Sequence, residues 1–307
     1  MNRTIGIVAL GAISHFLCDC LIVGAGEPID VILVAGQSNA VGYDAPPGEL
    51  PADTRDSEVM FWWRCGDPPP DKHDSTSAGW TTLRPQTLGD PIRPRSGRQY
   101  GNFAQPAGGF GPEMGMARRL VRRQQRPLAV IKVAFSGTHV AGDWSPNPAM
   151  IASKATTDDS QGACYRSLVD ETKRALNRLR SSHEPRLVAL VWVQGESDAT
   201  AERYQQYQSN LDAMIQSLRD DLGSPDLFAL IGVNAAFKSG NAAHMPEIIA
   251  AQRAYCASDP LARYVDTAGV STANPYHFDA RGTLEVGHRF AATYAELAEQ
   301  VSATTTP

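Results

Sequence analysis

The chain has 307 residues, of which 42% are hydrophobic and 20% charged, so it can bury a sizeable core, and disorder of the whole chain is excluded. Its 28 basic and 33 acidic residues give a formal net charge of −5. This balance disfavours a nucleic-acid-binding protein, which needs a basic surface. The arginines within residues 118–123 are interpreted as a solvated helix face, and the length favours one large α/β domain.

The first thirty residues differ in composition from the rest. Arg3 precedes two apolar stretches, and small residues at positions 24–26 offer a cleavage site before Glu27. This pattern is typical of a secretory signal peptide. It predicts a leader at residues 1–26, a single domain at 27–302, a disordered tail at 303–307, and a secreted or periplasmic protein. Because His15 and Asp19 interrupt the apolar run, no stable membrane anchor is expected.

Apolar runs of β type alternate with amphipathic stretches along the remaining chain. The runs predicted as strands are residues 31–35, 58–63, 128–134, 187–193, 227–233 and 263–266. One predicted helix begins at Pro112, and three others cover residues 165–176, 204–218 and 284–301. Because nearly continuous Val, Ile and Leu is typical of strands covered on both faces, the alternation predicts a parallel sheet. Right-handed crossovers then give a three-layer α/β/α sandwich.

Two long segments break this alternation, at residues 44–56 and 64–111, and loops of such length are usually functional or disordered. Three cysteines remain after the predicted leader: Cys65, Cys164 and Cys256. They lack metal-ligand spacing and are expected to be buried thiols, with one disulfide as the open alternative. No histidine, cysteine or carboxylate motif indicates a metal site.

Polar clusters follow four of the predicted strands, at residues 36–40, 135–138, 194–198 and 274–279. Because ligands bind at the carboxyl ends of parallel strands, we expect these clusters to converge on one crevice. Ser38 lies at a strand-to-helix turn, where a serine is either a nucleophile or a helix N-cap. His277 is the candidate general base. The nucleophile elbow, the dinucleotide fingerprint and the P-loop are absent at this turn, which disfavours a cofactor-binding fold.

Five short motifs together resemble a known family. They are GQSNA at 36–40, FGPE at 110–113, SGT at 136–138 followed by Trp144, QGESD at 194–198 and HFDARG at 277–282. Their order resembles SGNH/GDSL-type hydrolases, and most closely the branch of sialate O-acetylesterases and acetylxylan esterases. The resemblance implies the SGNH hydrolase fold with a flavodoxin-like parallel sheet, an acetylated carbohydrate as substrate and no cofactor.

The resemblance also implies roles for individual residues. Ser38 matches the family's nucleophile and His277 its general base. Gly137 matches the loop glycine whose N–H helps to form the oxyanion hole. The N–H of Ser38 is expected as a second donor to the oxyanion and the amide of Gln194 as a third.

One position departs from the family's pattern. SGNH enzymes commonly carry an aspartate three residues before the histidine, where this chain has Asn274. We therefore expect the carboxylate that orients the histidine to be Glu196, with Asp198 as the alternative. Asp279 suits a cap of the last helix better. The competing interpretation of Glu196 is a structural hydrogen-bond acceptor at the end of its strand.

The sequence thus predicts a serine-dependent carbohydrate O-acetylesterase that forms an acetyl-enzyme and acts on acetylxylan-like substrates. Trp144 is predicted to contact the sugar at the rim of the site. Within the same class, the alternative is a sialate O-acetylesterase or a general acyl esterase. From another class, the alternative is a non-catalytic carbohydrate-binding protein on a degenerate esterase fold, with Asn274 as the inactivating change.

Overall fold

The computed structural model describes residues 26–89, 103–123, 126–146, 161–240 and 242–305, and the predicted leader lies almost entirely outside them. Six parallel strands form the body of the sheet, in the order β2-β5-β1-β6-β7-β8. Their bounds are β1 Glu27–Gly36, β2 Val59–Gly66, β5 Leu128–Phe135, β6 His183–Val193, β7 Phe228–Gly232 and β8 Ala262–Tyr264. All six predicted strands are confirmed. Two short strands, β3 (Ser75–Thr76) and β4 (Thr81–Thr82), pair antiparallel with β2.

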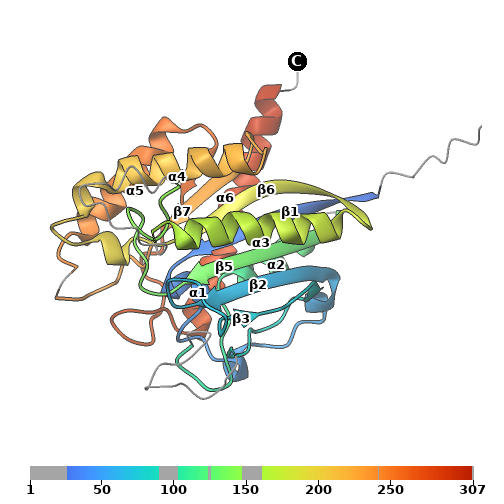
Figure 1. Cartoon of the computed structure of the whole chain (residues 1–307), viewed down its shortest axis with the longest axis horizontal. Coiled ribbons are helices and arrows are strands. Elements are labelled where there is room, and N and C mark those ends of the chain that lie inside the picture. The colour runs from blue at the N-terminus through green and yellow to red at the C-terminus, as the bar shows by residue number, and fades with distance from the viewer. Residues whose placement is uncertain (1–25, 90–102, 124–125, 147–160, 241, 306–307) are drawn as a thin grey trace, which may run out of the picture.

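Helices cover both faces of this sheet, as Figure 1 shows. One face packs against α3 (Ala163–Leu179), α4 (Tyr207–Asp221) and α5 (Met245–Ser258). The other packs against α1 (Ser38–Val41), α2 (Glu113–Val121) and α6 (Ala280–Thr305). The strands are nearly continuous in Val, Ile and Leu because both of their faces are buried. The predicted three-layer α/β/α sandwich is confirmed.

Two elements differ from the prediction. The apolar pattern did not predict α5, because its buried face includes Gln252, whose amide donates to the carbonyl of Gln194 (2.8 Å) and to the hydroxyl of Tyr207 (2.9 Å). Helix α6 continues to Thr305, so the expected disordered tail from residue 303 is wrong for residues 303–305.

The three cysteines are free thiols, with Cys65 and Cys164 buried and Cys256 partly buried. The preferred expectation of thiols over a disulfide is confirmed. Among the helices that the structure describes, none has the length and apolar character needed to cross a bilayer.

Candidate active site

Ser38 is the first residue of α1 and directly follows the end of β1. Gly36 has φ +136°, and a Cβ there would lie 2.1 Å from the carbonyl oxygen of Val193, so only glycine fits between β1 and β6. The N–H of Gln37 donates to the same carbonyl (3.0 Å), and its side-chain oxygen accepts from two N–H groups of residues 195–197 (3.3 Å each). The N-cap of α1 is Gln37, so Ser38 is the first residue inside the helix and not its cap.

A sharp turn after α1 brings the carboxylate of Asp44 into contact with His277. Gly42 ends α1 in the left-handed conformation (φ +83°), and a Cβ there would lie 1.8 Å from the carbonyl oxygen of Phe110. The chain then brings the Tyr43 ring to 4.7 Å from the His277 ring, measured between centroids. Oδ2 of Asp44 lies 2.7 Å from Nδ1 of His277, and both side chains are 17% exposed. Asp44 is therefore the carboxylate that contacts the candidate base.

Asn39, the residue after Ser38, fixes the backbone on both sides of His277. Its Oδ1 accepts from the N–H of Phe278 (3.0 Å) and its Nδ2 donates to the carbonyl of Tyr276 (3.1 Å). Because its side chain is buried, these bonds are shielded from water. The candidate nucleophile and the candidate base are thus held to each other by one side chain, and the predicted convergence of their two strand ends is confirmed.

The electrostatics of the histidine suit a general base. Partial burial lowers the pKa of His277 below its usual 6.5, although the hydrogen bond and charge of Asp44 act in the opposite direction. The net shift favours the neutral imidazole, the form that a general base needs. With Nδ1–H donating to Asp44, Nε2 is the atom left to accept a proton.

The expectation that Glu196 orients His277 is wrong. Oε1 of Glu196 accepts from Nδ2 of Asn39 (2.8 Å) and from the N–H of Asn234 (3.1 Å), and within the described residues Oε2 has no hydrogen-bond partner. Burial raises the pKa of Glu196. The side-chain Nδ2 atoms of Asn39 and Asn234 also donate to the carbonyl of Tyr276 (3.1 Å each), so Glu196 is the structural acceptor that the competing interpretation described.

The other two residues of the QGESD motif with a predicted role, Gln194 and Asp198, are also engaged elsewhere. The side-chain amide of Gln194 donates to the carbonyl of Thr138 (3.0 Å) and to Asp198 (2.5 Å), and its N–H donates to Gly232 (3.2 Å). It therefore has no donor left for an oxyanion, and that expectation is wrong. Asp198 accepts from the N–H of Val140 (3.1 Å), so the alternative acid supports the loop after β5 instead of the histidine.

The two remaining predicted oxyanion donors lie at the ends of neighbouring strands, since Gly36 pairs with Ala134. Gly137 is exposed in the left-handed conformation (φ +70°), and a Cβ there would have no atom within 4 Å. As the first residue of α1, Ser38 has an N–H without an intrahelical acceptor. Gly137 thus borders open space, and the role of both N–H groups as donors stays a prediction.

The predicted rim contact is wrong, because Trp144 is fully buried. It packs against Phe135 (6.1 Å between centroids) and Trp192 (5.0 Å) in the apolar layer beneath α3. Tyr276 instead is 46% exposed and is the large hydrophobic side chain most open to solvent in the described chain. It directly precedes the histidine, and its ring lies 5.8 Å from that of Phe237.

A buried ion pair that the sequence analysis missed supports α1 from behind. Nζ of Lys132 lies 3.0 Å from Oε1 of Glu113, and both side chains are fully buried. The ammonium also donates to the side chain of Gln86 (2.7 Å) and to the carbonyl of Val41, the last residue of α1 (2.8 Å). Its three donors are thus all used, and one of them fixes the end of the helix that carries Ser38.

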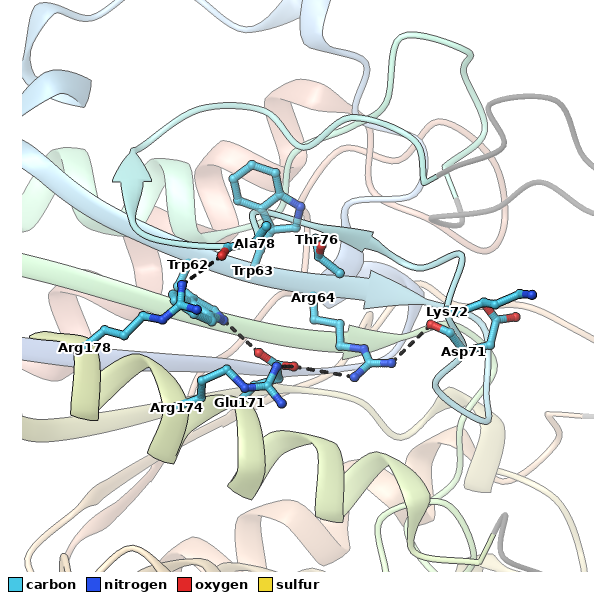
Figure 2. Close-up of a pocket in the computed structure, with 10 residues that line it drawn as sticks. All are labelled: Trp62, Trp63, Arg64, Asp71, Lys72, Thr76, Ala78, Glu171, Arg174 and Arg178. Atoms are coloured by element: carbon cyan, nitrogen blue, oxygen red, sulfur yellow. Dashed lines mark hydrogen bonds and ion pairs between the residues drawn. The ribbon is translucent and has the colours of Figure 1, made fainter.

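A separate pocket of about 250 Å³ lies between β2 and α3 (Figure 2). Glu171 forms its polar centre, accepting from Nε1 of Trp62 (3.0 Å) and from Arg174 (2.8 Å). Arg178 lies over the Trp62 ring at 5.2 Å, and Lys72 lines the far end. None of the predicted catalytic residues lines this pocket. Asp279, the predicted cap, accepts from Gly282 (2.6 Å) in the first turn of α6.

A serine after β1, a histidine before α6 and a carboxylate on that histidine lie at one edge of the α/β/α sandwich. The protein belongs to the enzyme class of carboxylic ester hydrolases. The chain belongs to the carbohydrate esterase, sialic acid-specific acetylesterase family, whose model matches residues 28–296. No curated protein sequence matches the chain.

Solved structures share the fold at low sequence identity. A protein from Arabidopsis thaliana is 18% identical with a TM-score of 0.59, and the match covers 87% of this chain and 98% of that one. NanS is 16% identical with a TM-score of 0.55, over 91% of this chain and 100% of NanS. A carbohydrate acetylesterase from Xanthomonas citri is 17% identical with a TM-score of 0.57, and the match covers 88% of this chain but 57% of that longer chain.

Proposed function

We propose that this protein is a serine-dependent O-acetylesterase that removes acetyl groups from sugars or polysaccharides. The observation that carries the proposal is the contact of 2.7 Å between Asp44 and Nδ1 of His277, on a turn that Asn39 ties to Ser38. The residue next to the candidate nucleophile thereby holds the candidate base, and the base has its own carboxylate. Family membership supports an acetylated carbohydrate as the substrate.

Each residue then has one task in the reaction. Oγ of Ser38 attacks the acetyl carbonyl while Nε2 of His277 takes its proton, and the imidazolium is stabilised by Asp44. The N–H groups of Ser38 and Gly137 stabilise the oxyanion. The tetrahedral intermediate collapses, and His277 returns the proton to the departing sugar oxygen. Water then attacks the acetyl-enzyme, gives a proton to His277, and releases acetate and the free serine.

The alternative of a non-catalytic carbohydrate-binding protein rested on Asn274 as a lesion. The charge that Asn274 lacks is supplied by Asp44, so the argument for a degenerate site loses its basis. Acetylxylan-like polysaccharides, sialate esters and simple acyl esters remain three substrate classes within one mechanism. Tyr276, exposed beside the histidine, is the side chain that we assign to contact with a sugar ring.

The test is hydrolysis of p-nitrophenyl acetate, with acetate release measured from acetylated xylan and from O-acetyl sialic acid. The wild type should hydrolyse the chromogenic ester, and Ser38→Ala should lower kcat by about 10⁴-fold or more with an unchanged circular dichroism spectrum. The rates of acetate release then show which of the two substrates, acetylated xylan or O-acetyl sialic acid, the enzyme prefers. Near-wild-type turnover by the alanine variant would exclude the serine mechanism, and an inactive but sugar-binding wild type would restore the non-catalytic alternative.

A further inference from the structure

The amide of Asn274 is divided between two tasks. Its Oδ1 accepts from the N–H groups of Tyr276 (2.9 Å) and His277 (3.0 Å), and so closes the turn that presents the imidazole. Its Nδ2 donates to Oδ2 of Asp44 (2.7 Å), the same oxygen that lies 2.7 Å from Nδ1 of His277. The turn, the imidazole and the carboxylate therefore form one closed ring of hydrogen bonds.

We propose that Asn274 is a positioning residue that holds the Asp44 carboxylate on His277, and that it must be a neutral amide to do so. The inference rests on the proposed function, in which Asp44 is the acid. An amide accepts at one end and donates at the other, whereas a carboxylate only accepts. At position 274 a carboxylate would keep the turn but would set its oxygen against Asp44, where two negative charges repel each other.

Relative to the family's pattern, an amide stands at the position three residues before the histidine, where an aspartate is common. The residue three positions before the histidine still forms the turn, and the charge comes from the loop after α1. An aspartate at position 274 could accept the two N–H bonds that close the turn, but it could not donate to Asp44. The turn alone therefore does not explain the bond from Nδ2 of Asn274 to Asp44. Asn274→Asp therefore separates a residue that only shapes the turn from one that also holds Asp44.

The charge around the histidine makes the test specific. Among the described residues, the titratable groups beside the His277 ring are the Asp44 carboxylate and the phenols of Tyr43 and Tyr276. Added negative charge at position 274 stabilises the imidazolium, so the pH at which the base becomes protonated rises. A disturbed turn lowers the rate without adding charge, so it does not move the pH profile upward.

The experiment measures kcat, KM and the pH dependence of kcat/KM on p-nitrophenyl acetate, with folding checked by circular dichroism. Asn274→Ala should lower kcat on the order of 10- to 100-fold, as expected for the loss of hydrogen bonds to a charged group, with little change in KM. Asn274→Asp should lower kcat to a similar extent and move the acidic limb to higher pH. In Asp44→Asn/Asn274→Asp the total charge is restored, so this variant should be faster than Asp44→Asn alone.

A matched control comes from the same loop. The hydroxyl of Ser271 donates to Asp279 (2.7 Å) and contacts neither Asp44 nor His277, so Ser271→Ala should keep the wild-type rate and pH profile. Wild-type kcat and an unmoved acidic limb in Asn274→Asp would overturn the inference, as would an equal loss in Ser271→Ala. These failures differ from that of the proposed function, which falls if Ser38→Ala stays active.

Discussion

Replacing Asp44 with asparagine tests the structure most directly, because the change removes a charge and little else. The amide keeps the shape of the carboxylate, and its oxygen can still accept from Nδ1 of His277 and Nδ2 of Asn274. The hydrogen-bond geometry is therefore retained while the imidazolium that forms during acyl transfer loses its counter-charge. The variant measures the electrostatic contribution of Asp44 to the transition state.

The magnitude follows from the contact distance. An Nδ1–Oδ2 distance of 2.7 Å places the two charge centres about 4 Å apart, where Coulomb's law at an effective dielectric constant near 20 gives about 4 kcal/mol. Because both side chains are 17% exposed, solvent screening reduces this to about 3 kcal/mol. We expect kcat to fall roughly 10²- to 10³-fold with a modest change in KM, because the interaction strengthens as charge develops.

The pH profile carries a second signature of the same change. Burial lowers the pKa of His277 and Asp44 raises it, so removal of the Asp44 charge lets this pKa fall further. The general base must be neutral, so the acidic limb of kcat/KM should move to lower pH in Asp44→Asn than in the wild type. The variant should thus have a lower plateau rate than the wild type, and its rate should begin to fall only at a lower pH.

Glu196→Gln provides the comparison, assayed in parallel on p-nitrophenyl acetate. Glu196 is the other carboxylate near the site, and its hydrogen bonds go to Asn39 and Asn234. We expect its kcat to fall by less than about tenfold and its acidic limb to stay in place. A crippled Glu196→Gln beside a nearly wild-type Asp44→Asn would refute the assignment of the acid, even if Ser38 and His277 stand.

Three further changes test the surroundings of the site. Tyr276→Ala should raise KM for acetylated xylan severalfold while kcat on p-nitrophenyl acetate changes little, since the ring is exposed beside the site. Lys132→Met leaves Glu113 as an unpaired buried charge and should lower the free energy of unfolding by about 3–5 kcal/mol in urea; Lys132→Met/Glu113→Gln should recover part of this loss. Burial raises the pKa of Asp198 to about 7, above its unfolded value near 3.8, so the folded state binds the extra proton and wild-type stability falls as the pH rises from 4 to 7. In Asp198→Asn that contribution is absent, so urea midpoints at pH 5 and pH 8 should differ less than in the wild type.

The sheet was predictable because its strands are buried on both faces, which leaves long apolar runs in the sequence. The convergence of Ser38 and His277 followed from the same prediction, since parallel strands end at one edge. Trp144 was misplaced because an aromatic residue in a polar loop has no signal of burial. Lys132 was missed because its partners, residues 41, 86 and 113, are scattered along the chain.

The acid escaped the sequence analysis for a related reason. Both candidates were chosen from a strand-end motif, whereas Asp44 is separated from His277 by 233 positions and begins a long loop. Its place depends on the left-handed turn at Gly42, which the sequence shows only as a glycine. The loop prediction marked the segment as functional or disordered and had no means of assigning a side chain to a distant imidazole.

A carboxylate serves a catalytic histidine from any position that reaches Nδ1, so the family's spacing is one solution among several. In this chain the proposed nucleophile, Asn39 and the proposed acid all lie within residues 36–44, and the distant turn supplies the imidazole. Loss of aspartate at the position of Asn274 is then tolerable only where a carboxylate follows α1. Relatives with N-x-x-H should therefore carry an acid two residues after the glycine that ends α1, and relatives with D-x-x-H should show no such preference. Active relatives that have N-x-x-H without that acid would contradict the coupling between the two positions.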